Sequence, residues 1–336
     1  MLRINEGDYA YASARIRARE PKLLGSSQFD RMIEAPAAEE AYKVLTEAEY
    51  GIEGRGMTGL FAFEELLSGE MKKSFMLLSE ITPHQEVIKA FQRRHDYFNI
   101  KVLLKAEFSG AEVPRILVDT GTIGAAEMTR MIRERDYGGL TPLMSEAISE
   151  VYDVFSRTRD PQAIDLILDR ASSRQQTMDL NAIDSPYLQG IAEIMTDITN
   201  IRMFVRARLL NKAWDFIKKL LIGEGTISEE IFFKNSDKPA ESFIEEIRQT
   251  RYGAAAAKGW ELYKAKKSLS GLEKLLDDHL MQYVKSAKMI TMGVEPVVAY
   301  LFAKEAEIRN VRIIMTGKIN RLPGDLIRER LREVYV

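Results

Sequence analysis

A glycine-rich stretch at residues 51–59 comes nearest to a nucleotide-binding motif. Gly51 and Gly56 have the spacing of a phosphate-binding loop, and Thr58 stands where such loops hold magnesium through a hydroxyl. Met57, however, occupies the position that requires a lysine, and the residues before Gly51 favour a helix rather than a strand. Bound phosphates would lack their cation. We therefore expect a turn here and no nucleotide.

Side chains for metal binding or acid–base catalysis are few and scattered. Cysteine is absent, which excludes disulfides and thiolate metal sites, and none of the three histidines has a glutamate three residues earlier as a di-iron site requires. Asp277-Asp278-His279 could ligate a metal, and Glu39-Glu40 and Glu245-Glu246 could form carboxylate pairs, but such groups are more typical of solvated helix faces. We expect no catalytic residue, no cofactor and no metal.

One polar pattern recurs three times: an acid, two residues, an asparagine, an aliphatic residue and a base. The asparagines lie 101 residues apart (200 − 99) and then 110 apart (310 − 200). Two interpretations stay open. In the first, the asparagine bonds buried backbone while acid and base form ion pairs between repeat units, as a framework. In the second, these residues form a polar ring that contacts a partner. The candidate residues are Asp96, Asn99, Lys101, Asp197, Asn200, Arg202, Glu307, Asn310 and Arg312.

The elements that carry these triples are predicted to be helices. An apolar trio at spacing i, i+3 and i+4 accompanies each triple, which forms a stripe on one helix face. A Tyr-Gly pair follows three of the four copies, counting a fainter one that begins at Asp8, and its glycine suits a helix C-cap with positive φ. The trios are Ile100, Leu103 and Leu104, then Ile201, Phe204 and Val205, then Val311, Ile314 and Met315; the pairs are Tyr50-Gly51, Tyr137-Gly138 and Tyr252-Gly253.

Other signals also favour helices. Thr82-Pro83, Thr141-Pro142, Asp160-Pro161 and Ser185-Pro186 each combine a capping side chain with a proline suited to the first helical turn. Thr82 and Gln85 also have capping-box spacing. Strict apolar–polar alternation is scarce, and residues 115–123 are the stretch most open to a strand. The predicted fold class is all-α.

The repeats predict the domain organisation. Residues 1–98, 99–199 and 200–309 would form three similar helical units, and residues 310–336 would close the chain by packing on the first unit. The period of about 100 residues is longer than the roughly 20–50 residues of common solenoids. We therefore expect a body with pseudo-threefold symmetry.

Composition narrows the classes of partner. The 48 basic and 50 acidic residues leave a net charge of −2, which argues against a nucleic-acid or anionic-membrane binder. No apolar run approaches the roughly 20 residues that cross a bilayer, so we expect any work at a membrane to pass through another protein. Residues 258–274 are basic with Trp260 and Tyr263 interleaved; they could contact lipid headgroups or an acidic partner, although solvated lysines are commoner.

Two segments resemble the family of C subunits of V-type (A/V-type) ATPases and ATP synthases, whose eukaryotic homologue is the V-ATPase d subunit. They are Tyr9–Ala18, which reads YAYASARIRA, and Gly293–Arg312, which reads GVEPVVAYLFAKEAEIRNVR. The middle Asn-Ile-Lys and Asn-Ile-Arg helices are similar too, so the resemblance spans the chain. It implies a funnel-like all-α body of three similar domains.

The resemblance also implies a function. The chain would be a non-catalytic central-stalk subunit on the cytoplasmic side of the membrane, attached peripherally as part of the ATPase complex. Its mouth would receive the rotor shaft, which consists of the D and F subunits, and its base would sit on the membrane proteolipid (c/K) ring. It would pass torque between them during ATP-coupled proton or sodium transport.

Two other classes of function stay open. One is a stand-alone helical scaffold for protein–protein interaction, which would have no affinity for a rotor shaft. The other is an all-α enzyme with a site in a helix bundle. That enzyme would need carboxylates or histidines converging from facing helices, and the sequence offers no convincing set.

Overall fold

The computed structural model describes residues 1–48, 50, 62–223 and 225–336. The regular structure of these residues is helical apart from two short strands, β1 (Leu2–Arg3) and β2 (Ile183–Asp184), which pair in parallel. The predicted all-α class is therefore confirmed. The glycine-rich stretch at 51–59 lies outside the described residues.

The chain divides into two compact units. Unit 1 comprises residues 1–3 and 84–238, and unit 2 comprises residues 4–83 and 239–336. The three-unit division at 99, 200 and 310, and the funnel with pseudo-threefold symmetry, stay predictions.

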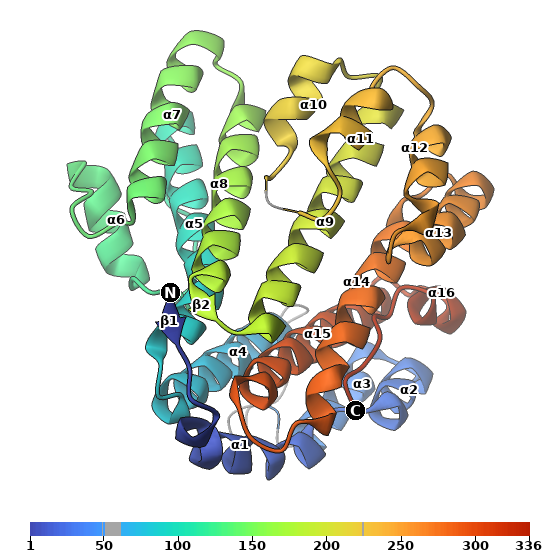
Figure 1. The fold of residues 1–336 in the computed structure, drawn as a ribbon. Helices are drawn as coiled ribbons and strands as arrows, with labels where there is room; N and C mark the ends of the chain where they lie inside the picture. Colours follow the sequence, from blue (N-terminus) through green and yellow to red (C-terminus); the bar gives the residue numbers. More distant parts are fainter. Residues whose placement is uncertain (49, 51–61, 224) are drawn as a thin grey trace. The chain divides into compact units, whose positions relative to one another are not determined.

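Unit 1 is built around long helices that pack side by side. Helix α8 contacts α5, α7 and α9, and the apolar faces of α5 to α8 share one core cluster (Figure 1). Its helices are α5 (Gln85–Ser109), α6 (Ala125–Glu134), α7 (Pro142–Thr158), α8 (Pro161–Asn181), α9 (Pro186–Leu209), α10 (Trp214–Leu220) and α11 (Glu229–Lys234).

Unit 2 is organised around one long helix, α15, which residues from the start of the chain surround. Helices α1, α2, α3 and α4 all contact α15, although they precede it by more than two hundred residues (Figure 1). A helix enclosed in this way must be apolar around most of its circumference, which explains its run from Val297 to Ala303. The elements are η1 (Glu6–Tyr9), α1 (Ala10–Arg17), η2 (Glu20–Lys22), α2 (Ser26–Glu34), α3 (Ala38–Glu47), α4 (Ala62–Ile81), α12 (Ala240–Glu246), η3 (Ile247–Gln249), α13 (Gly253–Lys266), α14 (Ser270–Val284), η4 (Lys285–Met289), α15 (Val294–Ile319) and α16 (Gly324–Arg328).

Three of the four predicted helix starts are confirmed. The side chains of Thr141, Asp160 and Ser185 accept hydrogen bonds from backbone N–H groups of the first turn at 3.2, 2.9 and 3.4 Å. In each case a proline follows at the first helical position, where no N–H is needed. These caps are local, which is why the sequence predicts them well.

The predicted start at Thr82-Pro83 is wrong. Helix α5 begins at Gln85, and its N-cap is His84, whose side chain does not cap the helix. The backbone N–H of Thr82 instead donates to the carbonyl of Leu78. The backbone of Thr82 therefore completes the C-terminal end of α4, and the capping box with Gln85 does not form.

The strand interpretation of residues 115–123 is also wrong. This segment consists of turns and bends. Its backbone groups at Val118 and Ile123 bond to side chains of α5 rather than to another strand. Leu117 and Ile123 pack against the core cluster of α5 to α8, whereas Ile116 is exposed.

The predicted glycine C-caps do not occur at the two Tyr-Gly pairs where both residues are described. Gly138 follows α6, but the residue with left-handed backbone at that helix end is Arg135, with φ of 56°. Gly253 is the first residue of α13, and a Cβ there would lie 2.0 Å from the carbonyl oxygen of Arg248. Close approach of two backbone segments, rather than positive φ, therefore requires glycine at 253.

Candidate functional site

The three predicted triples lie on the long helices α5, α9 and α15. Their acids and asparagines are at most 3% exposed, and the nine apolar residues of the accompanying stripes are at most 4% exposed. The stripe predicted from the spacing is therefore buried in all three copies. Buried polar groups need partners, so the bonds of the acids and asparagines show what holds them.

Each asparagine binds both backbone groups of one residue further along the chain. The Asn99 amide donates to the Val118 carbonyl at 2.8 Å and accepts from the Val118 N–H at 3.0 Å. Asn200 makes the same pair of bonds with Ile222, at 2.7 and 2.8 Å. Asn310 does so with Arg332, at 2.9 and 2.8 Å. We call this two-bond arrangement the asparagine clamp; it satisfies backbone that has no strand partner.

The acids of the first copy and the second hold the same loop with closely matching geometry. Asp96 accepts from the N–H of Thr122 and of Ile123, each at 3.1 Å, and from the Thr122 hydroxyl at 2.6 Å. Asp197 accepts from the N–H of Thr226 and of Ile227, each at 3.1 Å, and from the Thr226 hydroxyl at 2.5 Å. Burial raises the pKa of Asp96, and the bonds from Thr122 and Ile123 oppose that rise.

A signal for these loops exists in the sequence, although the analysis of the helices alone overlooks it. Gly-Thr-Ile occurs at residues 121–123 and again at 225–227, an offset of 104 (225 − 121), and the clamped Val118 and Ile222 share that offset (222 − 118). The glycine is required because a Cβ would lie 2.1 Å from the Asp96 Oδ1 atom in the first loop. Aligning the segments after the helices, as well as the helices, would have found both loops.

The third copy replaces the threonine with charged and phenolic partners. Glu307 accepts from the Leu24 N–H at 2.5 Å, from Lys304 Nζ at 2.6 Å and from the Tyr50 hydroxyl. The Lys304 ammonium also lies 4.6 Å from the centre of the Tyr50 ring and 3.8 Å from a carboxylate oxygen of Glu70. Burial and the charge of Glu307 raise the pKa of Tyr50, so the phenol keeps its proton and donates it.

Two of the three bases, Lys101 and Arg312, pair with acids outside the triples. Lys101 Nζ lies 2.5 Å from a carboxylate oxygen of Asp169 on α8. The Arg312 guanidinium binds both carboxylate oxygens of Glu64 on α4, with Nε–Oε1 at 2.8 Å and Nη2–Oε2 at 3.0 Å. In these two copies the expected pairing of acid with base is wrong, because backbone groups and uncharged donors already occupy Asp96 and a separate lysine binds Glu307. Arg202 is part-buried on α9.

The three asparagines each bind a different backbone segment, and Asp96, Asp197 and Glu307 likewise have separate partners. Each acid and asparagine ties a helix to a loop inside its own unit, while Lys101 and Arg312 form ion pairs on the flank of a helix. A nucleophile with its base, or a pair of facing carboxylates, does not arise from these contacts.

The other predicted chemical groups are engaged in ordinary contacts. Asp277 accepts from Arg309 at 3.0 Å and from Arg332 at 2.8 Å, and His279 packs edge-on against Tyr252. Asp278 accepts from Lys274 at 2.6 Å. In the part of the chain that the structure describes, no three His, Asp or Glu side chains are placed to hold a metal.

The basic segment at 258–274 also forms internal contacts. Lys264 pairs with Glu241 and Glu261, at 3.2 and 2.7 Å, and the rings of Trp260 and Tyr263 stack with centroids 4.9 Å apart. Leaving aside residues 49, 51–61 and 224, the chain has no helix that is both long and apolar enough to span a bilayer.

Comparison with known proteins identifies the family. The family described as ATP synthase (C/AC39) subunit matches residues 12–330. The C subunit of the V-type sodium ATPase of Enterococcus hirae is 26% identical over 331 residues, covering 98% of this chain and 99% of that protein. The C subunits of the A-type ATP synthases of Methanocaldococcus jannaschii and Haloferax volcanii are 25% and 24% identical, covering 98% and 96% of this chain and 87% and 96% of their own lengths. The all-α fold, the repeated helices and this match along nearly the whole chain agree: the protein belongs to the ATP synthase (C/AC39) subunit family.

Proposed function

We propose that this chain is the non-catalytic central-stalk subunit of a rotary V-type ATPase. It would link the rotor shaft to the membrane proteolipid ring and transmit torque during ATP-coupled proton or sodium transport. The observation that carries the proposal is the family match over residues 12–330, with relatives of similar length named as subunits of V-type and A-type enzymes. The chain would be bound peripherally on the cytoplasmic side.

The internal bonding of each unit suits a part that transmits force. A loop held at both its N–H and its C=O by a buried side chain cannot shift without exposing unpaired polar groups, which costs about 1–3 kcal/mol for each group. The three asparagine clamps hold such loops against α5, α9 and α15. We therefore propose that the acids and asparagines of the triples act as framework, and that partner contacts lie on exposed surfaces.

The proposed partners are the D and F subunits of the rotor shaft on one side and the proteolipid (c/K) ring on the other. A torque-bearing contact should be wide, with its energy spread over many residues. The match with subunits of other ATPases supports these partners by family membership.

The test is reconstitution with both partners. The purified chain is mixed with its cognate D–F shaft and separately with the detergent-solubilised ring, and complexes are followed by size-exclusion chromatography with light scattering. We expect a complex of one chain, one D and one F, and binding to the ring. If the chain binds neither the shaft nor the ring at roughly 10 μM, a concentration that detects even modest affinity, a stand-alone scaffold would be favoured.

A further inference from the structure

In the first two copies of the repeat, one continuous loop supplies both the residue in the asparagine clamp and an N–H group that binds the acid. In the first copy these are Val118 and Ile123, five residues apart (123 − 118). In the second they are Ile222 and Ile227, again five apart (227 − 222). A short covalent link raises the effective concentration at which either contact re-forms while the other holds. Each loop is therefore fastened twice.

In the third copy the same two positions come from segments far apart in the chain. The clamp holds Arg332 and the acid binds the Leu24 N–H, 308 residues away (332 − 24). Helix α2 begins two residues after Leu24, as α6 begins two residues after Ile123, so the two positions correspond. The segment that starts at Arg332 reaches the same place, because Val336 Cγ2 lies 3.8 Å from where a Cβ on Gly25 would be. The loop is thus interrupted between residues 336 and 24.

Residues 332–336, which we call the strap, are held by side chains. In the described part of the chain, no hydrogen bond between two backbone groups involves the strap. Besides the clamp, the Glu333 N–H donates to Asp278 at 2.7 Å, and Arg332 Nε lies 2.8 Å from a carboxylate oxygen of Asp277. The Glu333 carboxylate pairs with Lys285 at 2.5 Å, and these two side chains are 30% and 29% exposed. Water and salt compete for such a pair.

One aromatic side chain anchors the far end of the strap. Tyr335 is 2% exposed, its hydroxyl donates to Glu20 at 3.2 Å, and the Lys288 ammonium lies 4.9 Å from the centre of its ring. Val334 is partly buried against the core of unit 2, and Val336 is 44% exposed. Release of the strap therefore exposes one aromatic ring and part of a valine, and no helix has to unfold.

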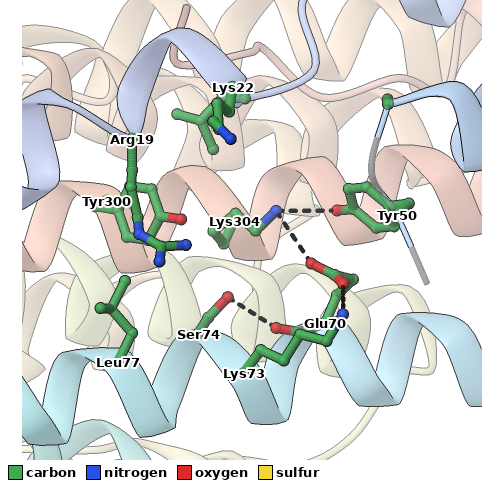
Figure 2. A pocket seen from close by; sticks show the side chains of 11 residues that line it. Arg19, Lys22, Tyr50, Glu70, Lys73, Ser74, Leu77, Tyr300 and Lys304 are labelled. Atoms are coloured by element: carbon green, nitrogen blue, oxygen red, sulfur yellow. Dashed lines mark hydrogen bonds and ion pairs between the residues drawn. The ribbon is translucent and has the colours of Figure 1, made fainter. Parts of the chain in front are cut away.

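The segment on the other side of the interruption is fastened separately. The Leu24 N–H and the Tyr50 hydroxyl both donate to Glu307. Figure 2 shows Lys304 of α15 directed towards Tyr50 and Glu70. None of these contacts involves the strap. The strap can therefore leave while Leu24 and Tyr50 stay bound to α15.

We propose that the strap is a latch, which releases from α14 and α15 and rebinds while both helices stay folded. When it is closed, its clamp bonds of 2.9 and 2.8 Å match those of the other copies. The difference lies in opening, because no covalent link to Leu24 returns the strap to its place. Release gives access to Ala303 and Glu307 of α15, which line one small cavity together with the strap. This inference goes beyond the proposed role in the stalk and does not depend on it.

The test is native-state hydrogen exchange of the full chain, read at single amides by NMR. We expect the protection factor of the Arg332 amide to be at least about tenfold below that of Leu24 and to change little in dilute urea, as for a local opening. The amides of Val118 and Ile123 should be protected to within about threefold of each other, because their loop opens as a whole. The bonds of Val118 and Arg332 to their asparagines are both part-buried, so burial does not separate them.

Two results of this experiment would overturn the proposal. Equal protection of Arg332 and Leu24 would mean that the strap has no opening of its own. A Val118 amide as weakly protected as that of Arg332 would mean that the interruption of the loop makes no difference.

A cross-link across the interruption sharpens the test. The chain has no cysteine, so Gly25→Cys/Val336→Cys allows a single disulfide, and Gly25 has an extended backbone that any residue adopts. Oxidation of this variant should raise the protection of Arg332 at least about tenfold and leave Val118 unchanged, and dithiothreitol should reverse the gain. Val336→Cys alone, treated identically, is the matched control and should exchange like the wild type. The proposal fails if the disulfide does not form, if it forms without slowing exchange at Arg332, or if the single variant slows exchange equally.

Discussion

The copies of the repeat on α5 and α9 in unit 1 differ from the copy on α15 in unit 2 in where the segment that binds the acid comes from. In unit 1, each helix binds a loop that follows it, with partners 19 to 30 residues away. In unit 2, the asparagine also binds ahead, to Arg332, but the acid binds Leu24, 283 residues earlier in the chain. The third copy is thus completed by segments from both ends of the chain.

This difference in connectivity accompanies a difference in chemistry. Within a continuous loop, an aspartate, a threonine and two backbone N–H groups suffice. At the discontinuous copy the acid is a glutamate, longer by one methylene, and its partners are a phenol and an ammonium. Buried ion pairs carry a desolvation cost that neutral hydrogen bonds avoid. The third copy therefore places a buried cation, Lys304, against its acid, whereas Asp96 in the first copy is held by backbone N–H groups and a hydroxyl.

The largest expected effect comes from removing that cation. Lys304→Met leaves Glu307 buried without its ammonium partner, whereas Glu70 keeps its ion pair with Lys73; breaking a buried pair such as Lys304–Glu307 costs roughly 3–5 kcal/mol of unfolding free energy. Urea denaturation followed by circular dichroism measures the loss. Arg93→Met is the matched control, because Arg93 also stands three residues before an acid of the repeat but pairs with Asp179 in a more exposed setting. Equal losses of unfolding free energy in the two variants would show that the buried ion pair of the third copy contributes no more to stability than the more exposed pair of the first.

The asparagine clamps allow a second comparison. Asn200→Ala leaves the N–H and C=O of Ile222 unpaired in a buried environment, for which we expect a loss of roughly 2–4 kcal/mol. Asn99→Ala should cost less, since the bonds to Val118 are part-buried and water can replace them. Hydrogen exchange at the Ile222 amide should quicken in the first variant. A larger loss of unfolding free energy for Asn99→Ala would show that the burial of a clamp does not determine how much it stabilises the protein.

The glycine beside Asp197 tests how tightly the acid holds its loop. A Cβ at Gly225 would lie 2.2 Å from the Asp197 Oδ1 atom, so Gly225→Ala must displace the carboxylate, and we expect a cost of about 1–3 kcal/mol. Gly223→Ala serves as the control because nothing lies within 4 Å of a Cβ there. Thermal unfolding of the two variants gives the comparison. Indistinguishable midpoints would mean that Asp197 moves aside freely.

The smallest effect concerns the response of unit 2 to pH. Burial, and secondarily the charge of Arg251, lowers the pKa of His279 below its ordinary value of 6.5. The unfolded chain therefore binds this proton more readily, and His279 makes the protein less stable as pH falls through about 6.5. In His279→Gln the decline in unfolding free energy between about pH 7.5 and pH 5.5 should be shallower than in the wild type. An unchanged slope would assign the acid sensitivity to other groups.

Features that depend on near neighbours along the chain follow from the sequence alone. The caps at Thr141, Asp160 and Ser185 and the buried stripe of Ile201, Phe204 and Val205 involve residues within one or two helical turns, so spacing predicts them. The segments Tyr9–Ala18 and Gly293–Arg312, with the middle Asn-Ile-Lys and Asn-Ile-Arg helices, suggest the family that the comparison establishes. Of the candidate residues, the repeated pattern identified acids and asparagines that the structure buries.

What those residues bind depends on the tertiary structure. The loops bound by Asn99 and Asn200 leave a repeated Gly-Thr-Ile in the sequence, but the Leu24 N–H that binds Glu307 lies 283 residues away, and no local pattern connects those two positions. Residues 115–123 form turns and bends whose backbone is bound by Asn99 and Asp96 of α5, a partner that apolar spacing does not reveal. The contacts around Lys304 and Glu307 exist because folding brings Leu24 and Tyr50 to α15. Periodicity reports which face of an element is buried, whereas the identity of the covering segment depends on how distant elements pack.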